Sequence, residues 1–316
     1  MEVADRIVVL RKGRVVGRLR KEEASIPGLA KLMVGREVLF RLEKRPVSPG
    51  DVALEIRGLK AIGDKGVLAL RGIWLKVRRG EIIGIAGVAG NGQKELVEVI
   101  YGLRKSLEGK ITLFGQDMTR KPTSRIIRLG TSLIPEDRLR RGIIPNFSVS
   151  ENLVLESIDS EPFSSKLMGE LRKLNEAEIE RHAEELIKKF NIVTPSTETR
   201  AITLSGGNIQ RLILARELSR KPSLIIAEEP TAGLDVAAAE FIRKLLLKAR
   251  ERMSAILLVS GDLSEILSLS DKVAVMYEGE ITGTFRPGEV SIDEIGLMMT
   301  GAKRMPKEKV INFWEL

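Results

Sequence analysis

Short apolar runs recur along the chain, and each ends at a glycine or a polar residue. Residues 81–86, 224–227 and 255–259 have the length and composition of strands that are buried on both faces. Between such runs the apolar residues follow helical spacing, as in residues 93–103. The alternation of strands and helices is typical of an α/β domain with a mostly parallel core sheet, and we predict that fold class.

Two other stretches have patterns of their own. Residues 52–57 alternate apolar and charged side chains, which predicts a half-buried strand at the edge of a sheet. His182 lies among charged neighbours within residues 165–190, so we expect it to be a solvent-exposed helical residue without a functional role. The apolar residues of that stretch could form one stripe over two helices: Leu167, Leu171, Leu174, Ile179, Ala183, Leu186, Ile187 and Phe190.

The two ends of the chain resemble each other. Residues 5–17 and 271–283 share a pattern of apolar positions around a Gly turn, at a constant offset of 266 residues. At the same offset, residues 32–35 echo residues 298–301. Both copies predict a strand, a turn, a second strand and a short helix. A segment with two prolines and a glycine, residues 45–50, predicts a linker after the first copy.

The composition excludes several kinds of site. The chain has 316 residues with no Cys and a single His, which excludes disulfides, thiolate metal sites, Cys nucleophiles and multi-His zinc sites. A hydrophobic content of 43% is typical of a globular protein. The apolar stretches are far shorter than the roughly 18 residues of a membrane span, and the first residues lack the basic start of a secretory signal. We therefore expect a cytosolic protein.

Positive charge is concentrated near the start of the chain. The formal net charge is +9, and residues 1–50 hold twelve Lys and Arg against six Asp and Glu. A basic segment on a chain whose remaining positive and negative side chains nearly balance is typical of proteins that bind nucleic acid or a membrane surface. A solvated face accounts for the same charge, so the charge alone does not choose a partner.

A glycine-rich turn joins one apolar run to the next helix. Gly87, Gly90 and Gly92 give the glycine frame of a phosphate-binding P-loop, in which backbone N–H groups curl around phosphate at a helix N-terminus. Gln93 takes the position of the phosphate-binding Lys, and Lys94 that of the Mg²⁺-binding Ser or Thr. Lys94 lies one position too far along the helix, so it points about 100° away from the required direction. By itself this turn could also be a packing feature.

Two further segments favour a nucleotide site. Ser205, Gly206 and Gly207 stand at the start of an amphipathic helix, where exposed N–H donors suit an anion. Further on, an apolar run ends in two carboxylates, Glu228 and Glu229. A strand that ends in carboxylates next to a P-loop is able to hold Mg²⁺ and to orient water.

Together these motifs resemble the ATP-binding cassette of ABC transporters over roughly residues 52–301, with all of them in family order. Residues 204–211 resemble the family signature. The resemblance assigns Glu228 to the Mg²⁺-linked carboxylate, Glu229 to the catalytic base and Asp235 to the D-loop.

Three positions depart from the family pattern. Residues 134–138 resemble the Q-loop, with Glu136 in place of the usual Gln, and residues 259–262 resemble the switch region, with Gly261 in place of His. The aromatic residue that stacks on adenine in the family is absent from residues 61–70. These departures imply slow chemistry at this chain's own P-loop.

The resemblance implies a P-loop NTPase fold with an antiparallel β subdomain and an inserted helical subdomain at about residues 140–203. Residues 84–93, 135–138 and 204–208 resemble the second cassette of the double-cassette ATPases of simple-sugar and nucleoside importers. The implied division is a C-terminal remnant of a preceding cassette at 1–36, a linker at 37–50, the cassette at 51–302 and a tail at 303–316.

The site predicted on this basis binds ATP and Mg²⁺. Glu229 is the predicted catalytic residue, and Glu136 and Glu228 are the predicted metal ligands. The residues predicted to contact ATP are Gly87, Gly90, Asn91, Gly92, Gln93, Lys94, Glu95, Ser205, Gly206, Gly207 and Asp235.

In this family, cassettes pair head to tail, with each ATP between the P-loop of one and the Ser-Gly-Gly of the other. The resemblance therefore implies weak or absent ATP hydrolysis by the chain alone and completion of a partner cassette's site. The implied partners are a second cassette, membrane permease subunits that dock on residues 136–193 and, indirectly, an extracellular solute-binding protein. The chain would then be cytoplasmic and peripheral on the inner face of the cell membrane, without nucleic acid. Two alternatives stay open: a cassette protein that acts on ribosomes or DNA, and an inactive product of a split gene.

Overall fold

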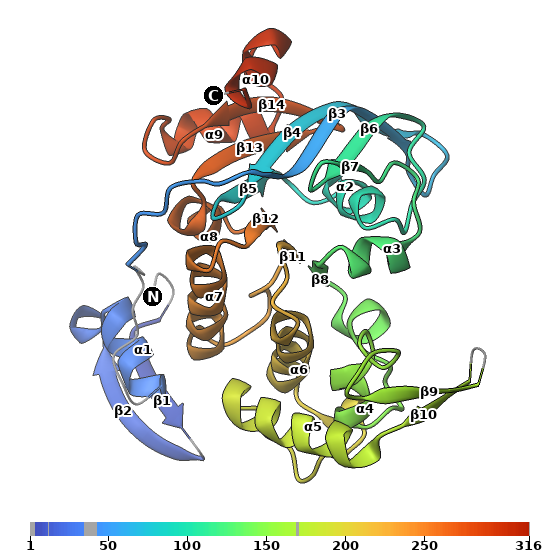
Figure 1. Ribbon diagram of the computed structural model, residues 1–316. Helices are drawn as coiled ribbons and strands as arrows, with labels where there is room; N and C mark the ends of the chain where they lie inside the picture. Colours follow the sequence, from blue (N-terminus) through green and yellow to red (C-terminus); the bar gives the residue numbers. More distant parts are fainter. Residues whose placement is uncertain (1–3, 12, 35–42, 169–170, 316) are drawn as a thin grey trace.

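A six-stranded sheet lies at the centre of the computed structural model, which describes residues 4–11, 13–34, 43–168 and 171–315 (Figure 1). Its strand order is β14-β13-β5-β12-β11-β8. The pairs from β13 to β8 are parallel, whereas β14 runs antiparallel to β13. The prediction of an α/β fold with a mostly parallel core sheet is confirmed. The strands are β5 (Ile82–Ala86), β8 (Thr131–Ile134), β11 (Leu224–Glu228), β12 (Ala255–Val259), β13 (Lys272–Tyr277) and β14 (Glu280–Phe285).

Both faces of this sheet are covered, which explains the continuous apolar runs. Ile82 and Ala86 of β5 pack into the core on the helical side, whereas Ile83 and Ile85 pack into the core on the opposite side. Successive side chains of a strand point to opposite faces, so a strand buried on both sides has no polar face. The helices on the first side include α6 (Gly206–Ser219), α7 (Val236–Glu251), α8 (Leu263–Leu269) and α9 (Ile292–Met299).

A second sheet, antiparallel and of order β4-β3-β6-β7, shares the other core with α2 (Gln93–Ile100). Residues 52–57 begin β3, which pairs with β4 on one side and β6 on the other. The prediction of an edge strand is therefore wrong, because alternation reports a solvent-facing row of side chains and not the number of backbone partners. The strands are β3 (Val52–Ile62), β4 (Leu68–Arg78), β6 (Glu108–Leu113) and β7 (Gln116–Asp117).

A lobe between β8 and α6 contains the stretch predicted as two helices. The second half is indeed helical, and Ile179 and Leu186 of α5 are buried. The first half is a hairpin in which Leu167 and Leu171 are 68% and 66% exposed, so that prediction is wrong. Leucines at helical spacing form a helix only where other parts of the protein pack against the row of apolar side chains that the spacing creates. Helix α3 (Thr123–Arg128) precedes β8, and the elements of the lobe are a π-helix η2 (Arg138–Gly142), α4 (Val149–Val154), β9 (Ser164–Met168), β10 (Leu171–Leu174), α5 (Glu176–Phe190) and a 3₁₀ turn η3 (Ala201–Thr203).

His182 is half-buried on α5, and the prediction that it is solvent-exposed is wrong. Its ring packs against Phe163 with ring centroids 4.9 Å apart. Burial lowers the pKa of the imidazole below its usual value. The residue therefore packs against Phe163 and does not line the cavity described below.

The two ends of the chain contain the elements that the repeat predicts. The first copy forms β1 (Arg6–Arg11), β2 (Arg14–Arg20), a 3₁₀ turn η1 (Lys21–Glu23) and α1 (Ile26–Val34), and α1 lies beside α7 (Figure 1). The hairpin β1-β2 is irregular between Val9 and Leu10, and the hairpin β13-β14 is irregular between Val275 and Met276. The same irregularity therefore recurs at the offset of the repeat. Residues 12 and 35 of the repeat, residues 1–3 and 36 of the predicted remnant, and residues 37–42 of the predicted linker lie outside the described residues.

The chain closes with α10 (Lys307–Phe313), which packs next to β4 and β14. Trp314, which follows it, is buried in the core shared with the antiparallel sheet. Within the described ranges, no helix has the length and apolar character needed to cross a membrane.

Candidate functional site

The glycine-rich turn connects the carboxyl end of β5 to the start of α2. Gly90 and Gly92 have φ values of +90° and +105°, in a region that residues with a Cβ rarely adopt. A Cβ on Gly92 would also lie 2.7 Å from the carbonyl oxygen of Ala69. The loop therefore needs glycine at this position to enter the helix, as the motif predicts.

The side chain of Gln93 folds back into this loop. Its Oε1 accepts a hydrogen bond from the backbone N–H of Asn91 at 3.0 Å, and its Nε2 donates to the carbonyl oxygen of Val88 at 3.0 Å. Gly87 leaves room for it, since a Cβ there would lie 2.4 Å from Nε2 of Gln93. A backbone N–H that could point at an anion is thus already occupied by a neutral carboxamide.

Asn91 fixes the loop to the rest of the fold. Its Oδ1 accepts a hydrogen bond from the backbone N–H of Glu278 at 2.8 Å, and its Nδ2 donates to the Val88 carbonyl at 2.8 Å. Glu278 lies in the turn between β13 and β14. The loop is therefore held by tertiary contacts in the conformation that encloses the Gln93 side chain.

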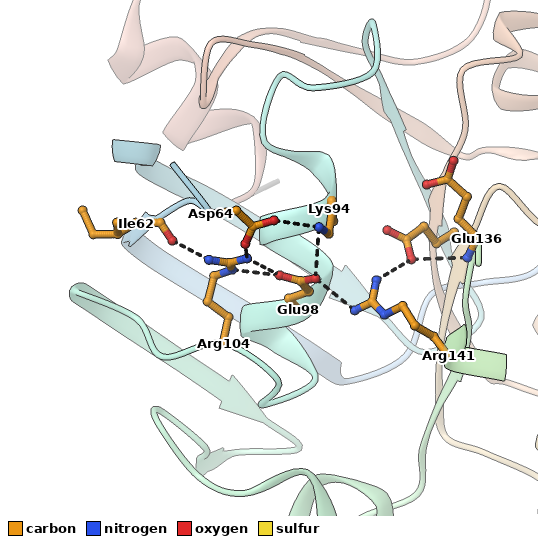
Figure 2. A network of polar contacts seen from close by, with 8 residues as sticks. Ile62, Asp64, Lys94, Glu98, Arg104, Glu136 and Arg141 are labelled. Atoms are coloured by element: carbon orange, nitrogen blue, oxygen red, sulfur yellow. Dashed lines mark hydrogen bonds and ion pairs between the residues drawn. The ribbon is translucent and has the colours of Figure 1, made fainter. Parts of the chain in front are cut away.

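Lys94 points away from the loop and into an ion-pair network (Figure 2). Its Nζ lies 2.9 Å from Oδ2 of Asp64 and 3.9 Å from Oε1 of Glu98. Hydrogen bonds from Arg104 and then Lys94 hold the pKa of Asp64 at about 2, so this carboxylate is charged at neutral pH. The network confirms the expected direction of Lys94 and gives it a partner 30 residues earlier in the chain.

The same network reaches the end of β11. Glu98 lies 2.7 Å from Arg104 and 3.1 Å from Arg141, and Arg141 lies 3.7 Å from Glu228 (Figure 2). Glu98 is one turn beyond Lys94 on α2. The i,i+4 spacing of the two residues is the one sequence feature that could have indicated Glu98 as a member of this network. Nothing local in the sequence indicated Arg104 or Arg141 as partners of the site.

Glu228 and Glu229 follow each other at the carboxyl end of β11 but differ in their surroundings. Glu228 is buried, which raises the pKa of its carboxyl, and its Oε2 accepts a hydrogen bond from the backbone N–H of Glu136 at 3.4 Å. Glu229 has φ +45°, a strained conformation for a residue with a side chain. Burial raises its pKa as well, and its Oε1 accepts a hydrogen bond from the backbone N–H of Gly261.

These groups meet around one small cavity of about 90 Å³. Its walls are the glycine loop, Gln93, Lys94 and the carboxylates of Glu136, Glu228 and Glu229. Among the described residues, no group of three or more acidic or His side chains is arranged to hold a metal ion by itself. Mg²⁺ ordinarily binds one or two carboxylates together with substrate phosphates. The carboxylates fit Mg²⁺ that arrives with phosphate, but not a metal site made by the protein alone.

Seven of the residues predicted to contact ATP do not line this cavity: Asn91, Gly92, Glu95, Ser205, Gly206, Gly207 and Asp235. Ser205 caps the N-terminus of α6 without a side-chain bond to the helix backbone; Ser205 and Gly206 are exposed, and Gly207 is partly so. Asp235 is exposed and caps α7, with Oδ1 accepting a hydrogen bond from Ala238 N–H at 2.8 Å. None of these residues lines the cavity.

Comparison with protein families identifies the family to which this chain belongs. The model of a family described as "ABC transporter" matches residues 70–232, which span the glycine loop and both carboxylates of β11. This chain belongs to the ABC transporter family. The cassette has the P-loop NTPase fold predicted from its motifs.

Curated relatives of this cassette are ATP-binding proteins of importers. The chain is 44% identical to the glucose import ATP-binding protein TsgD13 of Haloferax volcanii, over 95% of this chain and 54% of the relative. It is 42% identical to the guanosine import ATP-binding protein NupO of Bacillus subtilis, over 95% of this chain and 58% of the relative. The chain thus spans a little over half the length of the curated relatives that it matches.

Solved structures agree with the fold of this cassette. The ATP-binding cassette MJ0796, in a dimeric post-hydrolysis state bound to ADP and Pi, aligns with a TM-score of 0.63 at 22% identity, over 75% of this chain and all of that one. At that identity the likeness concerns the fold alone.

The structure brings Gly87, Gly90, Gln93 and Lys94 next to the three carboxylates, whereas the Ser-Gly-Gly segment and Asp235 stand apart.

Proposed function

We propose that this chain is the degenerate ATP-binding cassette of an ABC importer for simple sugars or nucleosides. It binds nucleotide weakly at its own P-loop and completes the ATP site of a partner cassette with Ser205, Gly206 and Gly207. The observation that carries this proposal is the side chain of Gln93, which stands at the Lys position and fills the loop through its bonds to Asn91 and Val88.

Two losses weaken the site on the P-loop side. A lysine–phosphate contact is charge-assisted and contributes roughly 1.5–3 kcal/mol, and a carboxamide supplies no charge. Lys94 does not replace it, because its ammonium lies between Asp64 and Glu98. A phosphate entering the loop would also have to displace the hydrogen bond between Gln93 and the N–H of Asn91. Both effects act against binding before any chemistry begins.

The carboxylates would serve the chemistry that remains. Glu228 and Glu136 would hold Mg²⁺, which neutralises phosphate charge when bound. Glu229 would act as the base that accepts a proton from water, and the N–H of Gly261 orients its carboxylate. The raised pKa of Glu229 fits a proton acceptor. Without a lysine or a switch His, we expect these groups to give slow turnover.

The residues at the signature position are accessible. Ser205 and Gly206 are exposed at the N-terminus of α6, a helix of 14 residues. Nothing lies within 4 Å of the position that a Cβ on Gly207 would take, so a partner's nucleotide has room there. Unsatisfied N–H groups and the helix dipole at such a terminus favour a phosphate. This supports a role for the chain as the signature half of a shared site.

We further infer that residues 1–36 are the end of a preceding cassette, before a linker at 37–50, the cassette proper at 51–302 and a tail at 303–316. Val8 and Leu10 on β1 are 55% and 65% exposed, whereas their counterparts at the repeat offset, Ala274 and Met276, are at most 1% exposed. In the described chain, β1 pairs with β2 in a sheet of two strands, whereas β13 also joins β5 in the core sheet. The first hairpin carries an apolar face that fits a core like that of the second.

The import role rests on the relatives' functions and on one surface. The helical subdomain, placed at about residues 140–203, and the residue just before it carry exposed apolar side chains: Leu139, Phe147 and Val193 are 49%, 39% and 70% exposed. We propose that this region, within residues 136–193, docks on membrane permease subunits that work with a solute-binding protein. The chain is then peripheral on the inner, cytoplasmic face of the membrane, and nucleic acid is not among its partners.

The experiment is steady-state ATP turnover of the purified chain as wild type and as Glu229→Gln. We expect turnover near background in both. The double variant Gln93→Lys/Lys94→Ser, which restores the P-loop residues, should bind nucleotide measurably tighter. Robust turnover of the wild type that is lost in Glu229→Gln would overturn the proposal, because it would show a competent site without a partner.

A further inference from the structure

A large cavity lies at the end of the core sheet opposite the glycine loop. Its volume is about 840 Å³, and it is lined by Ser223 and Ser254, at the amino ends of β11 and β12, and by the C-terminal parts of α5, α6 and α7. The carboxylates of the nucleotide site follow the carboxyl end of β11. A strand of this length spans about 17 Å at roughly 3.3 Å per residue, so the two sites are separate.

Five basic side chains surround this cavity, which we call the basic groove: Arg79, Lys189, Lys221, Lys248 and Arg252. None of the described residues that line it is acidic. Arg79 donates to Oγ of Ser223 at 3.3 Å and lies over the ring of Phe114, and Lys189 lies over the ring of Phe190. Within the ranges that the structure describes, no carboxylate lies within 4 Å of any of the five basic groups.

The floor of the basic groove is apolar. It includes Phe190, which is 3% exposed, and the half-buried Leu218, Phe241 and Leu245. Arg211 lies over the ring of Phe241, 5.7 Å from its centroid. The groove therefore joins an apolar surface to a positively charged rim.

The helix termini explain only part of this charge. Basic residues are favourable near helix C-termini, and each such terminus carries about −0.5 elementary charge, so α5, α6 and α7 together offset roughly 1.5 of the positive charges. Arg79 lies in the turn between β4 and β5 and is not part of a helix. Most of the positive charge is left without a partner beside an apolar floor.

We propose that the basic groove binds a small organic anion with a flat, apolar body. Its volume lies in the range of about 300–1,000 Å³ that is usual for small-molecule sites. The floor takes the body of the ligand, and the rim takes its anionic group through charge-assisted hydrogen bonds. The ligand would contact α5 of the helical lobe and α7 of the core at once. This site does not depend on the proposed role of the P-loop.

The probe is anilinonaphthalene sulfonate, whose fluorescence rises in an apolar site, and its uncharged analogue N-phenyl-naphthylamine. We expect one equivalent of the sulfonate to bind. Lys221→Glu and Lys248→Glu should each weaken it about tenfold, since each removes a charge-assisted contact. The matched control is Lys188→Glu on α5, an exposed lysine outside the lining, which should change binding less than about twofold. Melting curves of both Glu variants check that charge reversal has not perturbed the fold, and Lys221→Gln removes the same charge without reversing it.

Four results would overturn the proposal. The first is equal weakening by Lys188→Glu, which would mean non-specific attraction. The second is equal affinity for the uncharged analogue, which would remove the anion requirement. The third is displacement of the probe by inorganic sulfate at equal concentration, which would remove the apolar requirement. The fourth is displacement by a short polyglutamate peptide at equal concentration, which would identify the occupant as an acidic segment of a protein.

Discussion

Replacing Gln93 by Ala separates the effect of the side chain that fills the loop from the effect of the missing lysine. In the wild type, the carboxamide uses the N–H of Asn91 and the carbonyl of Val88, each at 3.0 Å. The Ala variant releases both groups and adds no charge. We expect nucleotide to bind tighter to Gln93→Ala than to the wild type, and tighter still to Gln93→Lys.

The magnitude follows from the two hydrogen bonds. Each contributes roughly 0.5–1.5 kcal/mol net, so displacing Gln93 costs an incoming nucleotide about 1–3 kcal/mol. A factor of ten in Kd is about 1.4 kcal/mol, so the Ala variant should bind about 5- to 150-fold tighter. A lysine adds a contact of roughly 1.5–3 kcal/mol. The Ala variant also loses the two bonds in its nucleotide-free state, so its free energy of unfolding should fall by about 1–3 kcal/mol.

The assay is titration with a fluorescent ATP analogue and Mg²⁺ at fixed salt, together with urea unfolding of each variant. Gln116→Ala is the matched control, because Gln116 is exposed on β7 and remote in sequence from the loop. It should leave the Kd unchanged. Weaker binding by Gln93→Ala than by the wild type would refute the reasoning, since it would mean that the carboxamide contacts nucleotide rather than blocking it.

Three further changes test other parts of the structure. Gly92→Ala places a Cβ 2.7 Å from the carbonyl of Ala69 at φ +105°, so the free energy of unfolding in urea should fall by about 2 kcal/mol or more. The control is Gly296→Ala in α9, where the Cβ meets open space, and its free energy of unfolding should not fall. Ser205→Ala should lower ATP turnover of the complex purified from its native membranes while leaving nucleotide affinity of the isolated chain unchanged; an unchanged turnover would contradict the shared site. Burial alone would raise the pKa of Asp271, but the guanidinium of Arg250 and the ammonium of Lys44 hold this pKa below the usual 3.8. Asp271→Asn should therefore lower the unfolding free energy by about 3 kcal/mol at pH 7, and the difference from the wild type should shrink as the pH falls below 4; a difference independent of pH would refute this.

The sequence by itself determined the features that depend on neighbouring residues. Strands β5, β11 and β12 are buried on both faces, and burial on both faces leaves a continuous apolar run in the chain. The glycine frame of the loop and the absence of a lysine at position 93 are equally local. The repeat at the two ends predicted two hairpins, and the recurrence of the same strand irregularity at Val9 and Val275 agrees with it.

Only the tertiary structure decided where the polar side chains go. The direction of Gln93 depends on the space beside Gly87, and the direction of Lys94 on Asp64. The number of neighbours of β3 and the uncovered leucines of β9 and β10 depend on which surfaces meet. Hydrogen bonds and ion pairs act over a few ångströms, between residues that are tens of positions apart in the chain. Their partners are therefore fixed by the packing of the whole domain and not by the local pattern.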